Sequence, residues 1–307
     1  MPHLTTVSVI VPLYNKAATV ERAIRSILIQ SYRSFEIIVV NDGSLDKSPD
    51  IVERLMQDYP EIQLNSQLNA GPGAARNAGV LKARGDLIAF LDADDEWRKD
   101  YLRTAVSALT AAPEALAFVS AYDAGPFSHA RPNKILQLGF GEATVAAPAP
   151  DADGPTLKMF VDAMHSSCVV VRRAAFNAAG GYFQLYRCLY GEDSWLWGRV
   201  LLSGPIFWDP DPLALFHVAD SELGFAIQKR QEARPISRLS DDFLSVVPLR
   251  SRESGRRLAK WFAEIDYNAL LQSGSWAAAA ELRSMHRING ALGIVKEWRH
   301  RLFRPGD

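Results

Sequence analysis

The chain has few cysteines and almost no net charge, and each shortage excludes a class of protein. Its 307 residues include two cysteines, Cys168 and Cys188, which form no Cys-x-x-Cys pair. No cysteine-based zinc site or dithiol redox motif is therefore predicted, and a reducing compartment is favoured. The formal net charge of −1 at pH 7 gives no general attraction for nucleic acid, so we expect no nucleic-acid partner.

Long hydrophobic runs are also absent. The sequence has no run of about 18 uninterrupted apolar residues, and residues 1–6 lack the basic and apolar regions of a signal peptide. We therefore expect a cytoplasmic protein without a transmembrane helix. Residues 295–304 mix cations with Trp298 and Phe303. That mixture is compatible with peripheral contact with the inner face of the cytoplasmic membrane, and it slightly favours a solvated final helix packed on the protein.

Strand-like and helix-like segments alternate in the first third of the chain. Short β-branched or apolar runs predict strands at 7–13, 35–40, 62–64 and 87–91. Apolar residues at helical spacing predict helices at 19–30, 48–59 and 71–83. This alternation predicts an α/β fold with a mostly parallel sheet and helices on both faces. Ligands of such sheets bind beyond the carboxyl ends of the strands.

The remaining two thirds are less regular. The pattern predicts loops over the site at 123–155, a strand at 164–171, helices at 173–179 and 192–202, and mostly helical structure at 225–304. We therefore expect a catalytic domain at 1–220 and a C-terminal helical extension at 221–307. The catalytic domain divides into a ligand-binding half at about 1–95 and a second half at about 96–220.

An acidic cluster, Asp92-Ala93-Asp94-Asp95, directly follows the predicted strand at 87–91. Clustered carboxylates repel one another, and a divalent cation relieves that repulsion. Mg²⁺ and Mn²⁺ take oxygen ligands and commonly bridge to substrate phosphates. The cluster therefore predicts a metal–diphosphate site. The alternative is that Asp94 or Asp95 caps a helix that begins near Trp97.

Two further polar segments follow strands or open helices. Asn41-Asp42-Gly43-Ser44 ends the strand at 35–40 and indicates either a ligand-binding loop or a simple turn. Gly71 and Gly73 precede Arg76 and favour close backbone packing at a helix start. Arg76 then either contacts a base or phosphate oxygen or forms a structural salt bridge.

The second half of the chain adds two candidates. Glu192-Asp193 begins a predicted helix, where the pair indicates either a general base or acids that favour the helix N-terminus. His217 follows a short apolar run and indicates either a structural histidine or a metal ligand.

These segments together, in this order, resemble a family 2 glycosyltransferase of the GT-A fold, a Rossmann-like mixed sheet flanked by helices. The resemblance covers residues 7 to 220. It rests on Val9-Ile10-Val11-Pro12-Leu13-Tyr14-Asn15, Val39-Val40-Asn41-Asp42-Gly43-Ser44, Asn69-Ala70-Gly71 with Ala75-Arg76-Asn77, Phe90-Leu91-Asp92-Ala93-Asp94-Asp95 and Gly191-Glu192-Asp193.

The resemblance implies an inverting transfer from a nucleotide-diphosphate sugar, with a UDP-sugar favoured, in bacterial surface glycan or glycoconjugate assembly. Asp193 would be the catalytic base. Donor-binding residues would be Pro12, Tyr14, Asn15, Asp42, Arg76, Asp92, Ala93 and Asp94. In the family's DxD motif, Asp92 would lie near the ribose and the Mn²⁺ or Mg²⁺ ion and Asp94 would bind the ion, with His217 completing its shell in some members.

The acceptor side is less defined. We expect His165, Tyr190, Glu192 and Trp195 to line it, although Trp195 and Trp197 are equally typical of core packing. The acceptor would be a saccharide, a lipid-linked saccharide or another hydroxyl compound. One rival is a non-catalytic nucleotide-sugar binding protein. The other is a nicotinamide-dependent oxidoreductase, which needs a glycine fingerprint that Pro12-Leu13-Tyr14-Asn15 lacks.

Overall fold

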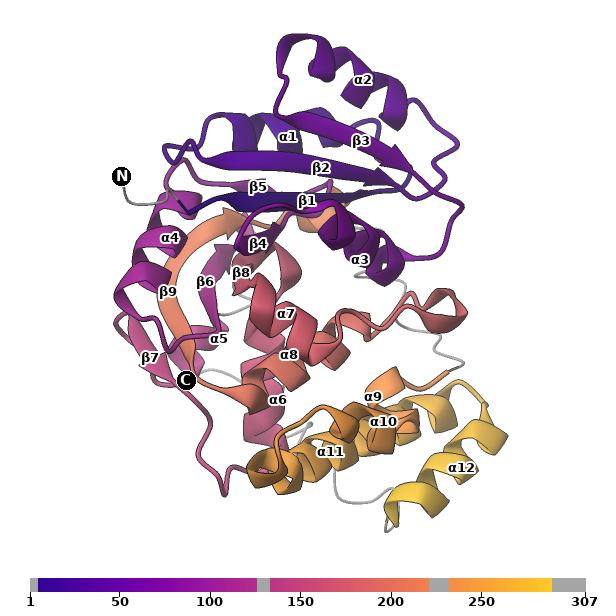
Figure 1. Ribbon diagram of the computed structural model, residues 1–307. Coiled ribbons are helices and arrows are strands. Elements are labelled where there is room, and N and C mark those ends of the chain that lie inside the picture. The colour runs from indigo at the N-terminus through magenta and orange to yellow at the C-terminus, as the bar shows by residue number, and fades with distance from the viewer. Residues whose placement is uncertain (1–4, 126–132, 221–231, 289–307) are drawn as a thin grey trace, which may run out of the picture.

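The computed structural model describes residues 5–125, 133–220 and 232–288. These residues form one mixed sheet with the strand order β3-β2-β1-β4-β8-β6-β9-β5, and β7 pairs with β9 (Figure 1). The strands are β1 (Val7–Leu13), β2 (Phe35–Asn41), β3 (Ile62–Ser66), β4 (Leu87–Phe90), β5 (Glu96–Trp97), β6 (Ala117–Asp123), β7 (Thr144–Ala146), β8 (Val169–Arg172) and β9 (Ile206–Leu215).

Helices cover both faces of this sheet. Along β1, Val7, Val9 and Val11 face one buried cluster and Ile10 faces the other, as the two-residue period of a strand requires. The first cluster includes α1 (Val20–Leu28), α2 (Ser48–Asp58) and α4 (Tyr101–Ala111). The second includes α3 (Pro72–Lys82), α6 (Gly154–Ala163), α7 (Arg173–Ala179) and α8 (Glu192–Ser203). The short helix α5 spans Lys134–Gln137.

The sheet order brings several chain segments to one edge. Strands β2, β1 and β4 are parallel neighbours, so the loops after all three emerge side by side. Strand β8 is antiparallel to β4, and its first residues therefore lie where β4 ends. Strand β9 is parallel to β6, which is antiparallel to β8, so the carboxyl end of β9 reaches the same edge. The ends of β1, β2 and β4 therefore converge as predicted. The start of β8 and the carboxyl end of β9 also reach this edge.

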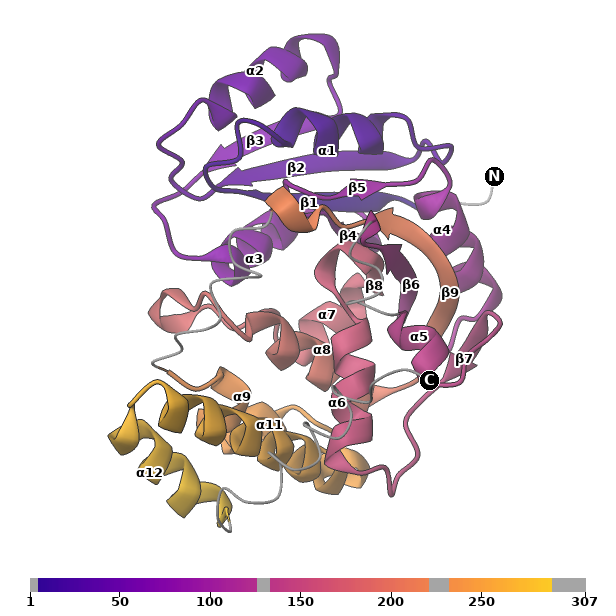
Figure 2. The same cartoon turned by 180° about the vertical axis from the view of Figure 1, so that it is seen from behind.

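The C-terminal helices form a further layer on α6 and α8 (Figure 2). They are α9 (Pro235–Arg238), α10 (Ser240–Ser245), α11 (Arg252–Gln272) and α12 (Trp276–His286). Phe243, Leu258 and Phe262 from these helices belong to the buried cluster of the sheet. Gly154 allows close approach, because a Cβ there would lie 2.6 Å from the Cβ of Trp261. The helical character of this region is as expected, except that 225–231 and 289–304 lie outside the described residues.

Some sequence-based expectations are wrong in detail. Residues 166–168 form a 3₁₀ turn, so only the last three residues of the strand expected at 164–171 pair in the sheet, as part of β8. Neither Asp94 nor Asp95 caps a helix, because β5 follows them and α4 begins only at Tyr101. Strands β6 and β9 were not predicted, since their residues show no clear alternation. No described helix combines the length and apolarity that crossing a bilayer requires.

Phe243→Ala is expected to lower the free energy of unfolding by about 3–5 kcal/mol, since it empties a site between Trp195 and α11. Chemical denaturation followed by circular dichroism measures this loss. The matched control is Trp276→Ala, whose side chain is 66% exposed and whose removal should change stability little. If Phe243→Ala instead produced a separate unfolding transition at lower denaturant concentration and left the main transition unchanged, the sheet and the C-terminal helices would not share one core.

Candidate functional site

The loops after β1 and β2 are joined by hydrogen bonds. Asn15 adopts a φ of 52°, its backbone N–H donates to Ser44 Oγ at 3.1 Å, and its Oδ1 accepts from the Leu45 N–H at 2.8 Å. Tyr14 is 40% exposed beside them, and Pro12 is half-buried. An exposed ring on a fixed loop is available for stacking on a flat ligand.

Asp42 is buried and already has three protein donors. Its Oδ1 accepts from Gln67 Nε2 and from the Ala70 N–H, both at 2.8 Å, and its Oδ2 accepts from the Gly71 N–H at 2.9 Å. This carboxylate therefore joins the β2 loop to the start of α3. A carboxylate has about four acceptor positions, so one remains for a ligand.

Three potential metal ligands converge at the carboxyl end of β4. One donor atom each from Asp92, Asp95 and His165 lies within 4.8 Å of the others. Ser167 joins the two acids, because its hydroxyl donates to Asp95 Oδ2 at 2.6 Å and accepts from the Asp92 N–H at 3.2 Å. Ala93, between the acids, is buried. The donor set of two carboxylates and one imidazole suits a divalent cation such as Mn²⁺.

The electrostatics of this cluster also fit a cation. Asp95 is 1% exposed, and burial together with the charges of Asp92 and Asp94 raises its pKa well above the ordinary range. Among residues 5–125, 133–220 and 232–288, no atom is hydrogen-bonded to its Oδ1, although the nearby His217 backbone favours ionisation. Desolvation lowers the pKa of His165, which keeps the imidazole neutral and able to bind a metal.

Asp94, the expected principal metal ligand, forms a salt bridge with Lys16. Its Oδ2 lies 2.9 Å from Lys16 Nζ, and Lys16 also donates to the Asp220 carbonyl at 2.9 Å. Burial and the charge of Asp92 raise the pKa of Asp94, while Lys16 opposes this. Asp94 therefore lies beside the metal-ligand cluster but is paired with Lys16 in this structure.

His217 reaches the same edge but contacts a different carboxylate. Its Nε2 lies 2.7 Å from Glu96 Oε1. Arg22 lies 3.2 Å from the same Glu96 oxygen and 2.8 Å from Asp220. His217 is thus part of a charged network beside the acidic cluster, and it is not one of the three converging ligand atoms.

Arg76 connects the acidic cluster to α8. Its guanidinium is 2.6 Å from Asp92 Oδ1 and 3.1 Å from Glu192 Oε1, and it lies over the Tyr182 ring. Arg76 is 5% exposed. Burial raises the Asp92 pKa, but the charge and hydrogen bond of Arg76, together with the charges of His165 and Lys16, outweigh burial and lower it. Of the two roles left open for Arg76, the structure contains the salt bridge.

The expected catalytic pair lies at the start of α8. Gly191, the N-cap, has a φ of 83°, a conformation that favours glycine. Glu192 is buried, and burial with the neighbouring charge of Asp193 raises its pKa to about 7, against the opposing effect of Arg76. Asp193 is only half-buried, and its charge is close enough to favour protonation of His165. Glu192 therefore faces Arg76, whereas the half-buried carboxylate of Asp193 lies near His165.

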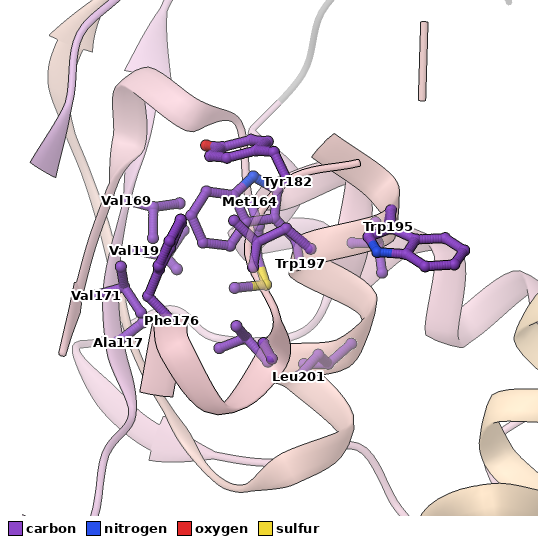
Figure 3. Close-up of a cluster of buried hydrophobic side chains, with 14 of the residues drawn as sticks. Ala117, Val119, Met164, Val169, Val171, Phe176, Tyr182, Trp195, Trp197 and Leu201 are labelled. Atoms are coloured by element: carbon purple, nitrogen blue, oxygen red, sulfur yellow. The ribbon is translucent and has the colours of Figure 1, made fainter. Parts of the chain in front are cut away.

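Trp195 must be removed from the acceptor side. It is 6% exposed, and its ring packs against Phe183, Phe243 and the Arg199 guanidinium. Trp197 is fully buried beside Phe90 and Tyr182 (Figure 3). Both indoles are core residues, because α8 turns its apolar side toward α7 and the C-terminal helices. Tyr190 is half-buried, and its hydroxyl accepts from Arg234.

Sequence reasoning missed several contributors to this site. Asp95 belonged to the predicted acidic cluster but was singled out only as a possible cap, His165 and Ser167 were candidates for the acceptor side, and Lys16 had no role. The adjacent acid in Asp94-Asp95 was a usable signal for Asp95. His165 and Ser167 had none, because they reach the site only through the antiparallel pairing of β8 with β4.

Comparison with known proteins gives a family match. Residues 8–184 match the model of the family described as glycosyl transferase family 2. An uncharacterized glycosyltransferase of Nostoc is 44% identical over 101 residues, which is 33% of this chain and 31% of that protein. The putative glycosyltransferase EpsH of Bacillus subtilis is 43% identical over 103 residues, 32% of this chain and 30% of that protein. The chain thus covers about a third of the length of these curated relatives.

Solved structures share the fold at low sequence identity. Mannosyltransferase PcManGT from Pyrobaculum calidifontis, in complex with GDP-Man and Mn²⁺, has a TM-score of 0.63 and 20% identity, covering 99% of this chain and 82% of that one. TarS of S. aureus, in complex with UDP, has a TM-score of 0.59 and 17% identity, covering 98% of this chain and 94% of that one. Both likenesses establish the GT-A architecture.

Asp95→Asn is expected to raise the melting temperature in the absence of metal. The raised pKa of Asp95 means that folding favours the protonated form, so wild-type stability falls as pH rises from the ordinary carboxyl pKa through the raised one. The neutral amide removes this penalty. Mn²⁺ should stabilise the wild type and not the variant.

Differential scanning fluorimetry at neutral pH, with and without Mn²⁺, measures both effects. Asp58→Asn, at the exposed end of α2, is the matched control and should behave like the wild type. Equal Mn²⁺ stabilisation of wild type and Asp95→Asn would contradict a ligand role for Asp95.

Proposed function

The chain belongs to glycosyl transferase family 2, and we propose that it transfers a sugar from a UDP-sugar to a hydroxyl acceptor with inversion at the anomeric carbon. The observation that carries the proposal is the convergence of Asp92, Asp95 and His165 beside the α8 terminus that presents Asp193. A cation site and a half-buried carboxylate thus lie at one edge of the sheet. This pairing is what the displacement of a diphosphate by a hydroxyl requires.

The donor side would use the β1 and β2 loops. Tyr14 is exposed for stacking on the nucleobase, and Asp42 retains one acceptor position for a base N–H. Pro12 and Asn15 fix the shape of this loop. Uracil is the proposed base; TarS was solved with UDP and PcManGT with GDP-Man, so guanine is the competing outcome of the donor assay.

Asp92, Asp95 and His165 are the residues that would hold the metal, and Asp94, which is paired with Lys16 in this structure, would be a further ligand. A bound divalent cation offsets the negative charge of the departing nucleoside diphosphate and orients it. Because one ligand is an imidazole, we propose Mn²⁺ ahead of Mg²⁺, which prefers oxygen ligands. Arg76 holds Asp92 ionised and in place for this role.

Asp193 is the proposed general base. The acceptor oxygen forms a bond to the anomeric carbon while its proton passes to the Asp193 carboxylate. The bond from that carbon to the diphosphate oxygen breaks, and its electron pair leaves with the nucleoside diphosphate. A single displacement of this kind inverts the anomeric centre. The buried Glu192 stays paired with Arg76 and orients it.

The acceptor proposal is coarser. We propose a saccharide or lipid-linked saccharide in bacterial surface glycan assembly, bound near His165 and Tyr190.

We also propose peripheral contact with the cytoplasmic membrane through residues 295–304, a segment that lies outside the described residues. Flotation of the full chain with anionic vesicles should exceed that of a chain ending at Asn289. Equal flotation would contradict the membrane contact.

Incubation with Mn²⁺ and a panel of UDP-N-acetylglucosamine, UDP-glucose, UDP-galactose and GDP-mannose should release nucleotide from one donor. Slow hydrolysis is expected even without the acceptor, because water replaces the hydroxyl. EDTA should abolish the release. The absence of release from every donor, with and without saccharide acceptors, would contradict the proposed function and favour a non-catalytic binding protein.

Asp193→Asn should lower nucleotide release by about 100-fold or more, since the amide takes up no proton. It should bind UDP with Mn²⁺ as the wild type does. Asp94→Asn should instead weaken Mn²⁺-dependent UDP binding. Isothermal titration calorimetry and the release assay separate the two effects, and near-normal release by Asp193→Asn would remove that residue from the base role.

A further inference from the structure

A buried ion pair lies directly behind the turn that carries the proposed base. Arg234 precedes α9, and Asp266 lies in the middle of α11; their side chains are 6% and 1% exposed. Arg234 Nη1 donates to Asp266 Oδ1 at 2.5 Å, and the Arg234 backbone N–H donates to Oδ2 at 2.9 Å. Ser237 Oγ donates to the same Oδ2 at 2.7 Å. Asp266 therefore fixes both the backbone and the side chain of Arg234.

The part of the Arg234 side chain that does not face Asp266 contacts the segment before α8. Its second terminal nitrogen donates to the Tyr190 hydroxyl, and its guanidinium carbon lies 4.7 Å from the centre of the Tyr190 ring. The methylenes of Arg234 press on Gly191, because a Cβ at Gly191 would lie 2.8 Å from Arg234 Cγ. The guanidinium also lies 4.9 Å from the centre of the Phe262 ring, on the core side.

Gly191 is the N-cap of α8, and Asp193 is the second residue of that helix. The preceding residues Tyr186 and Arg187 both have positive φ angles, of 59° and 51°, so this approach to α8 is not fixed by favourable local conformation. In the part of the chain that the structure describes, no side chain caps the start of α8. Contacts from outside must therefore set its position: Arg76 pairs with Glu192, and Arg234 contacts Tyr190 and Gly191 just before it.

We propose that Arg234, held by Asp266, is a positioning residue that places the Tyr190–Gly191 turn, and through it Asp193, for the transfer step. The inference rests on the proposed role of Asp193. It assigns the C-terminal helices a function in catalysis, since both members of the ion pair come from them. A group that must lie within hydrogen-bonding reach of the acceptor proton is sensitive to displacements of about 1 Å.

Arg234→Met alone removes the positive charge that faces the buried Asp266 carboxylate, which is itself destabilising. The decisive variant is therefore the neutral pair Arg234→Met with Asp266→Asn. It keeps an acceptor oxygen for Ser237 or the Arg234 N–H and removes the contact to Tyr190. Tyr190→Phe is a milder second variant, which retains the ring and loses only the hydroxyl contact. Leu282→Ala, in the separate cluster between α11 and α12, controls for destabilisation of the C-terminal helices.

The readout is a split between turnover and donor binding. The neutral pair should lower the kcat of Mn²⁺-dependent nucleotide release by roughly 10- to 100-fold, and Tyr190→Phe should lower it less. Neither variant should change the KM for the donor or the calorimetric Kd for UDP with Mn²⁺. Leu282→Ala should lower the melting temperature and keep the wild-type kcat.

Wild-type kcat in a folded neutral pair would overturn the proposal. If that pair does not fold, wild-type kcat in Tyr190→Phe would overturn it instead. A loss of kcat in Leu282→Ala equal to that of the other variants would also overturn it, since it would reduce the ion pair to general stability. Failure of the wild type to release nucleotide would instead remove the proposed function on which the inference rests.

Discussion

Repulsion among three carboxylates at the end of β4 is the constraint on which the rest of the site depends. Asp92, Asp94 and Asp95 lie within four residues, and two of them have raised pKa values because of burial and mutual charge. Arg76 offsets the charge of Asp92, and Lys16 that of Asp94. Within the described residues, Ser167 gives Asp95 a hydroxyl and no side-chain cation lies against it. The fold therefore places one more carboxyl group at this point than its own cations balance, and a divalent cation would favour the ionised form of that group.

The partners of these acids come from elements far apart in the sequence. Arg76 belongs to α3, Lys16 to the loop after β1, and His165 and Ser167 to the segment before β8. Arg76 also reaches Glu192 at the start of α8, so the charge balance of the acidic cluster extends to the helix with the proposed base. The proposed donor and acceptor sides are thus joined by one buried guanidinium rather than by a continuous strand or helix.

The C-terminal helices support this arrangement by packing against α8 on its core side. Phe243 and Phe262 fill the core beneath α8, and Arg234 contacts the turn that leads into it. These helices therefore stabilise the position of α8 as well as extending the chain. The division into a domain at 1–220 and an extension at 221–307 remains a prediction. A test of that division must account for the buried cluster that the sheet, α8 and the C-terminal helices share.

The sequence by itself determined the first third of the fold and the strand ends at which the candidate site lies. Uninterrupted β-branched runs and helical spacing are local signals, so the elements from Val7 to Phe90 and the polar residues that end β1, β2 and β4 could be read directly. The ordered motifs also sufficed to identify the family. Tertiary structure alone decided which side chains meet. The antiparallel pairing of β8 places His165 and Ser167 beside the acidic cluster, and β9 places His217 against Glu96. Packing against neighbouring elements buries Trp195 in the core. The contacts behind these outcomes join residues about 50 to 120 positions apart, and no local pattern encodes them.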